Sequence, residues 1–281
     1  MKKIALAAAA ATLLSAGAAS AADLTARPYT KAPAPIVAVY NWTGFYIGAS
    51  VGGDVVRSDV DGRFDPLAPG ITPAQFTDIN RQLSPRLRDT AVIAGGQAGY
   101  NWQAGAWLVG VEGDISWRRA RATSTINPMV ITGVPPATQG NLSAQSFESN
   151  WLGTFRGRLG GVVNNSLLLY VTGGLAVADY RNTDTVGFAG PAAAGQGPQT
   201  AATSETRVGW AAGAGAEWMF APNWSVKAEY LHADLGRTSS TVPSFAAPFV
   251  NTDVTYSHRL TEDLGRVGVN YHFGGPVVAK Y

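Results

Sequence analysis

Three histidines are the residues of this sequence with the greatest potential for chemistry at neutral pH, because histidine binds metals and transfers protons. They are His232, His258 and His272, and they lie far apart in the sequence. Their spacing matches no zinc motif. The chain contains no cysteine, so thiolate ligands, disulfides and a cysteine nucleophile are excluded. The sequence therefore predicts neither a metal site nor a cofactor.

A serine beside one histidine raises the question of nucleophilic catalysis, which requires a base within hydrogen-bonding distance of the hydroxyl. Ser257 precedes His258, but adjacent residues of a β-strand point to opposite faces. Asp234 can share a strand face with His232, and such a pair at a strand end is more typical of a structural hydrogen bond. We therefore expect no catalytic residue and no enzymatic activity.

The composition is unusually poor in charged residues. Charged residues make up 14% of the chain, against roughly 25% in an average soluble domain. The 281 residues include 33 glycines and 8 tryptophans, and this apolar content is too high for a disordered segment. Without Lys2 and Lys3, 19 basic residues face 19 acidic ones, so nothing favours nucleic acid as a partner.

The N-terminal segment is typical of an exported protein. Lys2 and Lys3 precede an uncharged apolar run over 4–14, and Ala19-Ser20-Ala21 provides the small residues of a cleavage site. The apolar run is too short for a transmembrane anchor, which needs about 20 residues. We predict a signal peptide over 1–21 that is cleaved, followed by a proline-rich periplasmic linker over 22–40.

The remaining sequence alternates with a period of two, as β-strands do. In Trp107–Arg118, one face carries apolar residues with a tryptophan at each end, and the other carries Glu112, Asp114 and Arg118. The same pattern predicts eight strands, at about 44–56, 90–102, 107–119, 147–163, 167–181, 204–220, 224–235 and 255–273. Each strand reaches the ~9–11 residues that a membrane-spanning β-strand needs.

The connections between these strands alternate in length. Long ones are expected at 57–88, 120–146, 182–203 and 236–254, and short ones at 103–106, 164–166 and 221–223. Short periplasmic turns and long extracellular loops are typical of outer-membrane barrels. The fold prediction is an all-β, eight-stranded antiparallel up-and-down transmembrane β-barrel over 41–273, followed by a C-terminal extension over 274–281. A transmembrane helix over 159–178 is the alternative, and Asn164-Asn165-Ser166 disfavours it as turn chemistry.

The strand faces then assign roles to side chains. An eight-stranded barrel is only wide enough for its own side chains, so inward charges should form a network. The predicted lumen charges are Glu112, Asp114, Arg118, Arg156, Arg158, Glu217, Lys227, Glu229 and Arg266. The predicted aromatic girdle is Trp102, Trp107, Trp117, Trp151, Trp210, Trp218, Phe220, Trp224 and Tyr230. Possible lipopolysaccharide contacts are Arg81, Arg86, Arg88, Arg118, Arg119 and Arg121, because arginine pairs bidentately with phosphate; solvated loop charge is the alternative.

The two ends of the predicted barrel resemble a known family. Tyr29-Thr30-Lys31-Ala32-Pro33, the run from Tyr40 to Gly48 and the C-terminal run from Val267 to Phe273 are similar to the opacity or immunogenic outer-membrane proteins of α-proteobacteria, which share the fold of OmpA and OmpX. In that family the last strand carries the signal read by the barrel-assembly machinery. The resemblance assigns this signal to Arg266, Gly268, Tyr271 and Phe273. Many barrels of that family end at this aromatic residue, whereas eight residues follow Phe273 here. This difference leaves open whether Phe273 or Tyr281 ends the signal.

From these features we expect a monomeric structural protein of the outer membrane that anchors surface loops and supports envelope integrity, with membrane lipid and lipopolysaccharide as partners. A narrow, porin-like diffusion channel is the first alternative, and it depends on whether the inward charges pair or line a water path. A surface adhesin or receptor that acts through its long loops is the second.

Overall fold

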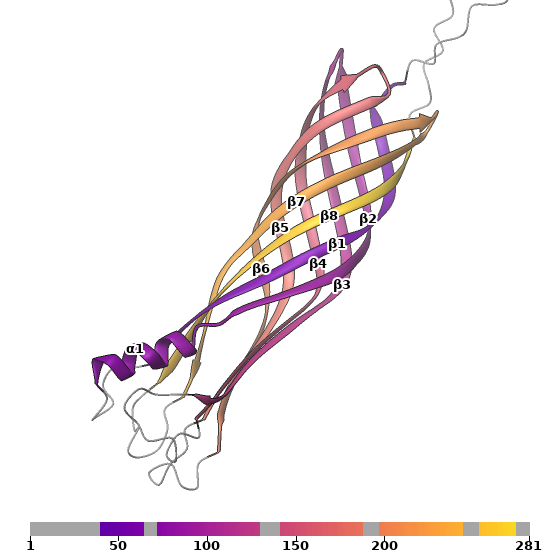
Figure 1. The fold of residues 1–281 in the computed structure, drawn as a ribbon. Coiled ribbons are helices and arrows are strands. Elements are labelled where there is room, and N and C mark those ends of the chain that lie inside the picture. The colour runs from indigo at the N-terminus through magenta and orange to yellow at the C-terminus, as the bar shows by residue number, and fades with distance from the viewer. Residues whose placement is uncertain (1–39, 65–71, 130–140, 188–196, 244–252, 274–281) are drawn as a thin grey trace, which may run out of the picture. The chain divides into compact units, whose positions relative to one another are not determined.

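The computed structural model describes residues 40–64, 72–129, 141–187, 197–243 and 253–273. Its elements are β1 (Gly44–Phe64), α1 (Pro73–Gln82), β2 (Arg86–Ala104), β3 (Trp107–Met129), β4 (Asn141–Val163), β5 (Leu167–Gly187), β6 (Gln199–Ala221), β7 (Trp224–Val242) and β8 (Val254–His272). The strands follow one another around a closed antiparallel barrel in which β8 pairs with β1 (Figure 1). The predicted eight-stranded up-and-down barrel is confirmed. The predicted signal peptide, linker residues 22–39 and the extension 274–281 lie outside the described residues.

Three tight turns connect the strands at one end of the barrel, where the sequence predicted them. In the turn between β4 and β5, Asn164 and Asn165 have φ angles of 51° and 60°, a left-handed backbone that asparagine tolerates well. The N–H of Phe273 donates to the carbonyl of Phe45 at 2.9 Å, so both described ends of the barrel lie at this turn end. Short turns of outer-membrane barrels face the periplasm. Because 159–178 forms two strands and a turn, the transmembrane-helix alternative is wrong.

At the opposite end the strands are longer than the sequence predicted. β1 continues past 56 to Phe64, and β3 continues past 119 to Met129. The connections expected over 57–88, 120–146, 182–203 and 236–254 are therefore partly strand, and those predicted boundaries are wrong. The alternation of side chains does not stop where the prediction ended the strands. Instead, the apolar residues move from the outward face to the inward face.

β1 and β8 both show this change of faces. In β1, Ile47 and Val51 point outward and Asp54 is buried inside. Beyond Asp54 the buried inward residues are Val56, Ser58, Val60, Gly62 and Phe64, and the outward ones are Arg57, Asp59, Asp61 and Arg63. An apolar outer face suits lipid, and an apolar inner face suits a sheet in water. We call the part toward the turns the membrane-embedded half and the part beyond the change the extracellular extension.

Two of the eight strand pairs separate in the extracellular extension. The β2–β3 ladder ends at Ala94 and Trp117, and the β6–β7 ladder ends at Trp210 and Asp234. The other six ladders continue outward. The extension therefore consists of two four-stranded sheets, β7–β8–β1–β2 and β3–β4–β5–β6.

Side chains bridge both of these seams. At the β2–β3 seam, the carboxylate of Asp89 accepts a hydrogen bond from the backbone N–H of Arg121 at 2.7 Å. At the β6–β7 seam, the guanidinium of Arg207 donates to the carbonyls of Leu235, at 3.2 Å, and Arg237. Charged residues on a strand edge also discourage pairing with another chain. The seams are thus closed by polar side chains in place of a backbone ladder.

An apolar core fills the interior of the extension. Its members include Val56, Val60, Phe64, Leu87, Ile93, Phe147, Leu152, Val186, Leu231, Leu235, Val242, Val254, Leu260 and Leu264. Tyr180 and Tyr256 belong to the same core, and burial raises the pKa of both phenols above their ordinary value. Both phenols therefore stay neutral, and the hydroxyl of Tyr180 lies 2.9 Å from that of Ser58.

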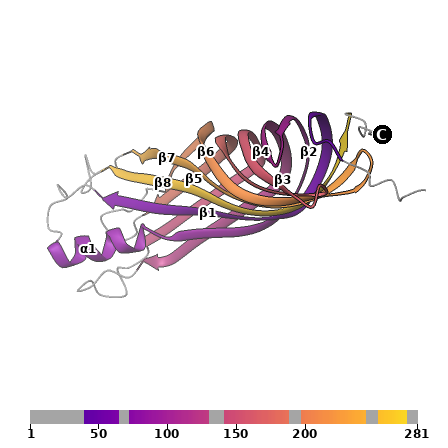
Figure 2. The same cartoon turned by 90° about the horizontal axis from the view of Figure 1, so that it is seen from above.

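Helix α1 covers part of this core and was not predicted from the sequence. Thr72 caps it with a capping box to Gln75, and Pro73 occupies its first turn. Ile79 and Leu83 are buried against the extension, and Figure 2 shows α1 beside the outer end of β1. No helix among the described residues is long and apolar enough to cross a membrane. Its ten residues are too few for a strong helical period, and the sequence therefore suggested only a loop.

Candidate functional site

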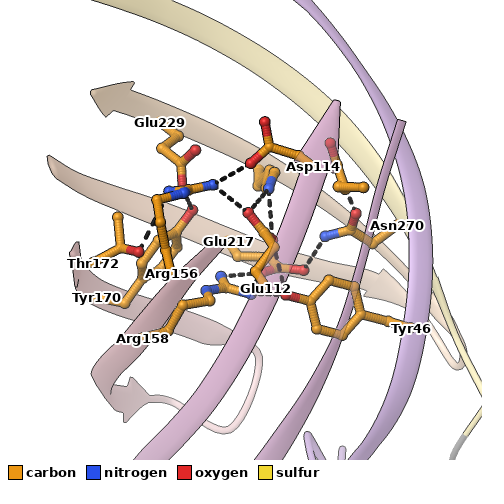
Figure 3. A network of polar contacts seen from close by, with 12 residues as sticks. Tyr46, Glu112, Asp114, Arg156, Arg158, Tyr170, Thr172, Glu217, Glu229 and Asn270 are labelled. Atoms are coloured by element: carbon orange, nitrogen blue, oxygen red, sulfur yellow. Dashed lines mark hydrogen bonds and ion pairs between the residues drawn. The ribbon is translucent and has the colours of Figure 1, made fainter. Parts of the chain in front are cut away.

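A network of ionised side chains fills the lumen of the membrane-embedded half (Figure 3). Glu112 of β3 lies at its centre. It accepts hydrogen bonds from Lys227 of β7 at 2.8 and 2.9 Å and from Arg156 of β4 at 2.7 Å. The hydroxyl of Tyr46 of β1 donates to the same carboxylate at 2.8 Å. Four strands from around the barrel therefore meet at one carboxylate.

Two arginines extend the network toward the extension. Arg156 also donates to Asp114 at 2.8 Å and to Glu229 at 3.2 Å. Arg266 donates to Asp114 at 2.9 Å and to Glu229 at 2.8 Å. Each of these two carboxylates thus lies between two guanidinium groups.

An Arg158–Glu217 pair forms the layer of the network closest to the turns. The two side chains are 2.7 Å apart. Ser225 and Asn270 donate to the other oxygen of the Glu217 carboxylate at 2.5 and 2.7 Å. The guanidinium carbon of Arg158 lies 3.9 Å from the centroid of the Tyr170 ring, a cation–π distance.

The network is balanced in charge and closed to solvent. Its carboxylates are Glu112, Asp114, Glu217 and Glu229, and its cations are Arg156, Arg158, Lys227 and Arg266. All eight residues are buried, and none is more than 9% exposed. Taking ions out of water is expensive, so a buried set is stable only when each charge has opposite partners and further hydrogen bonds. The structure brings together eight of the nine residues that the sequence placed in the lumen.

The ninth residue, Arg118, belongs to a separate cluster farther out. It pairs with Asp54 and, at 2.6 Å, with Glu262, and it donates to Ser149 at 2.8 Å. The Arg118 side chain is fully buried, so it points into the barrel and cannot contact lipopolysaccharide. That part of the prediction is wrong. Asp54 and Glu262 were missed because they lie where the two faces exchange polarity.

The tyrosines of the network were also missed. Tyr46 and Tyr170 are buried, and their hydroxyls donate to Glu112 and Glu229. A Cβ on Gly99 would overlap the Tyr46 ring, and one on Gly215 would overlap the Tyr170 ring. A glycine directly beside an inward aromatic residue is the signal that these rings lie across the lumen. Register across the strands is needed to recognise it.

Apolar residues close the lumen on the turn side of the network. Trp42 precedes β1 and is fully buried among Leu108, Leu168, Tyr170 and Met219. Its backbone N–H donates to the side chain of Gln103 at 3.0 Å, and its indole N–H donates to the carbonyl of Asn165 at 3.3 Å. The apolar core of the extension lies on the other side. The lumen is thus filled at three successive levels.

The predicted girdle residues all point out of the barrel, as two rows. Trp102, Trp107, Trp218, Phe220 and Trp224 lie near the turns, and Trp117, Trp151, Trp210 and Tyr230 lie toward the extension. Trp151 is half-buried and the other eight are exposed. Trp117 and Trp151 face each other in the β3–β4 register. Phe45 and Phe273, which the predicted girdle omits, contact each other near the turns in a tilted arrangement with ring centroids 5.5 Å apart.

The arginines proposed for lipid contact do not share one location. Arg81 lies on α1 and pairs with Asp78, and Arg86 lies 3.6 Å from Asp59 at the outer end of β2. Arg88, Arg119 and Arg121 lie on β2 and β3 and are exposed. The latter two follow directly after Trp117 on the outward face of β3. They line a pocket of about 230 Å³.

Each histidine is engaged by a separate partner. His272 lies 2.9 Å from Ser225 and 3.3 Å from Glu217, and His258 is buried 2.9 Å from Asp184. His232 lies 2.9 Å from Asp263. Asp234 lies on the same face of β7 as His232, but it pairs with Arg259 at 2.6 Å. Among the described residues, no group of three or more acidic or histidine side chains is arranged to hold a metal ion.

The proposed insertion signal runs from Arg266, near the middle of β8, to Phe273, directly after its turn end. Arg266 and Gly268 face the lumen, and Tyr271 and Phe273 face outward beside Trp224 and Phe45. The signal residues thus divide between the two faces of one strand. Arg266 also belongs to the lumen network, so it serves the folded barrel as well.

The fold and the filled lumen define a class of protein, a small membrane-spanning β-barrel. Comparison with known proteins agrees: the family model of the outer membrane protein beta-barrel domain matches residues 6–273. The chain is 31% identical over 282 residues to the 31 kDa outer-membrane immunogenic protein of Brucella melitensis, and the alignment covers 97% of this chain and 100% of that protein. It is 30% identical over 144 residues to the 22 kDa outer membrane protein of Rhizobium leguminosarum bv. viciae, covering 50% and 52% of the two chains.

Two solved structures of outer-membrane or surface proteins are similar to this chain at low sequence identity. Neisserial surface protein A is 12% identical with a TM-score of 0.37, and the match covers 82% of this chain and 98% of that one. OprG of Pseudomonas aeruginosa is 14% identical with a TM-score of 0.39, covering 83% and 98%. On the family match and the Brucella relative, the chain belongs to the outer membrane protein beta-barrel family and resides in the outer membrane. The resemblance to α-proteobacterial outer-membrane proteins is confirmed.

Proposed function

We propose that this protein is a structural, non-catalytic and non-conducting monomer that anchors an extracellular extension in the outer membrane and supports the envelope. One observation carries the proposal: the lumen is filled at every level. Arg156 and Arg158 cross it with fully buried side chains, and Trp42 closes it toward the turns. A water path through the barrel would expose some of these groups. The sequence left open whether the charges pair, and in this geometry they do.

Single-channel recording of the purified folded protein in planar bilayers tests this proposal. We expect no steady conductance from the wild type, because an ion would have to break several buried ion pairs to pass. The double variant Arg156→Ala, Arg158→Ala removes the side chains that cross the lumen, and it is the positive control for a barrel that has been opened. A reproducible ohmic current from the wild-type monomer would instead establish the porin-like alternative.

The extracellular extension favours a second role, in surface interactions. Along β3 it runs from Trp117 to Met129, which corresponds to about 40 Å of strand at about 3.3 Å per residue. A packed two-sheet body of this length carries the outer ends of the strands well beyond the outer row of the girdle. Replacing the connection 130–140 or 188–196 by a short glycine-serine linker should then abolish binding to a host surface while the barrel still inserts. Unchanged binding would exclude these two connections as the adhesive parts.

We further propose that Tyr271 and Phe273 form the signal for the barrel-assembly machinery. Both rings lie on the outward face at the turn end of the last strand, where they contact Trp224 and Phe45. Phe273→Ala should lower the amount of inserted barrel more than deletion of 274–281 does. The comparison is made by the gel mobility of unheated membrane fractions. A deletion more harmful than the substitution would place the end of the signal at Tyr281.

A further inference from the structure

The charges just beyond the outer row of the girdle are unevenly distributed around the barrel. On β1–β3 they form what we call the basic collar, which consists of Arg57, Arg88, Arg119 and Arg121 and is opposed by Asp59 and Asp89. On β4–β8 the outward charges at this level are Glu148, Asp179, Asp234 and Asp263 against Arg181, Arg237 and Arg259. One side of the barrel therefore presents net positive charge to its surroundings, and the other does not.

A pocket lies in the basic collar between β3 and β4. Its volume is about 230 Å³, and it is lined by Arg119, Ala120, Arg121, Glu148 and Asn150. It forms where the register of β3 against β4 shifts between Trp117 and Ala120. Such a bulge bends the strand and redirects its side chains, and bulges are common beside binding sites.

The donors of this pocket are not all occupied. Two nitrogens of Arg121 donate to Glu148, which fixes that guanidinium and leaves Nη1 available. Asn150 is bound to Asp179 at 2.9 Å. The side chain of Arg119 is exposed and forms no ion pair or hydrogen bond with any other residue that the structure describes. An arginine presents five N–H donors in a planar fork that matches the oxygens of a phosphate.

The depth of the pocket matches the headgroup layer of the outer leaflet. Arg119 lies two residues beyond Trp117, which is about 7 Å along the strand. A bilayer has roughly 30 Å of hydrocarbon within 40–45 Å in total, which leaves about 5–8 Å of headgroup on each side. Tryptophan marks the border of the hydrocarbon. Arg119 and the open nitrogen of Arg121 are therefore at the level where lipid phosphates lie.

We propose that the β3–β4 pocket binds a phosphate group of the lipid anchor of lipopolysaccharide, with Arg119 as its principal ligand and Arg121 as the second. Charge-assisted, bidentate hydrogen bonds between guanidinium and phosphate hold the headgroup against the bulge. The acyl chains of the lipid then lie along the outward face below Trp117 and Trp151. Lipid binding at this pocket does not depend on whether the lumen conducts.

Isothermal titration of the detergent-solubilised barrel with purified lipid A tests the proposal. In EDTA, we expect the double variant Arg119→Ala, Arg121→Ala to bind lipid A at least about tenfold more weakly than the wild type, because hydrogen bonds to charged groups are lost. Arg119→Lys keeps the charge but loses the fork and should be intermediate. Arg81→Ala removes an exposed arginine of α1 that does not line the pocket, and it should bind like the wild type. Gel mobility without heating verifies that each variant is folded.

Five outcomes would overturn the proposal. The double variant binds lipid A as tightly as the wild type, or Arg81→Ala weakens binding as much as the double variant does. Dephosphorylated lipid A binds as well as the phosphorylated form, which would assign the affinity to the acyl chains. Binding disappears in EDTA and returns with Mg²⁺, which would assign it to a cation bridge through the carboxylates. Inorganic phosphate alone binds with the affinity of lipid A, which would make the pocket a site for free anions.

Discussion

The same eight strands build two regions with opposite polarity. In the membrane-embedded half, Val109, Val111 and Ile115 of β3 face outward and Glu112 and Asp114 face inward. In the extension, β1 directs Arg57, Asp59 and Asp61 outward and Val56, Val60 and Phe64 inward. The outer solvent explains the difference, because lipid accepts only apolar side chains and water accepts charged ones. The strand geometry is the same on both sides of the border.

The two regions also differ in closure. Within the membrane every ladder is complete, since hydrocarbon offers no partner for a free backbone group. Beyond Ala94 and Trp210, two ladders end and the barrel becomes two sheets. In water an unpaired strand edge can be hydrated, and charged side chains protect it from association. Closure is thus a requirement of the lipid, and an apolar core between two sheets is sufficient outside it.

Of the substitutions that test this comparison, one in the lumen network should lower the free energy of unfolding most. Glu112→Ala leaves Lys227 and Arg156 buried without their shared carboxylate, and we expect a loss of about 3–5 kcal/mol in the free energy of unfolding. Urea denaturation in lipid vesicles measures it. Glu205→Ala removes a partly exposed acid of the extension that pairs with Arg207, and it should cost no more than about 1 kcal/mol. Equal effects of the two substitutions would mean that the network is hydrated.

Placing a cation on the outward face tests where the membrane-embedded half ends and the extracellular extension begins. Val111→Arg puts a charge in the middle of the lipid-facing stripe and should destabilise the inserted barrel by roughly 2–4 kcal/mol. Thr123→Arg makes the equivalent change on the same face of the same strand, beyond Trp117, and should leave stability unchanged. Both are measured as unfolding midpoints in bilayers. If Thr123→Arg is as harmful as Val111→Arg, β3 is still in lipid at that position.

Disrupting the β6–β7 seam should cause the smallest of these losses of stability. Arg207→Ala removes the hydrogen bonds to the carbonyls of Leu235 and Arg237, and we expect a loss of about 1.5–3 kcal/mol, the range for bonds to charged groups. Arg237→Ala removes a neighbouring exposed arginine but keeps the carbonyl that Arg207 contacts, so it serves as the control. Faster amide exchange in the outer part of β7 would accompany the loss. Identical exchange in the two variants would show that the side chain of Arg207 does not hold the seam.

The membrane-embedded half was predictable from sequence because one physical rule governs every strand there. Outward positions must be apolar, so alternation in Trp107–Arg118 reveals both the strand and its faces. The inward charges follow from the same parity, and eight of the nine predicted residues meet in one network. The pairing of Glu112 with Lys227 was not predictable, because it depends on register across the whole lumen.

The extension escaped prediction because the rule reverses without a break in the chain. At Asp54 the inward face turns from polar to apolar, and a search for an outward apolar stripe ends the strand there. Arg118 lies close to this reversal. The sequence assigned it both to the lumen and to lipid contact, and its side chain is buried inside the barrel. Alternation over 57–64 was present in the sequence, with Val60 and Phe64 separated by charged residues. A search for either polarity would have found it.

Cysteine labelling in intact cells tests most directly the claim that the strands leave the membrane and reverse their polarity. The chain contains no cysteine, so each introduced thiol reports on one site. With a membrane-impermeant maleimide, Thr123→Cys and Thr206→Cys should be labelled on whole cells, because both face water in the extension. Val111→Cys, in lipid, and Leu260→Cys, in the core between the sheets, should stay unlabelled until the protein is denatured. Labelling of Leu260→Cys together with protection of Thr123→Cys would contradict the reversal.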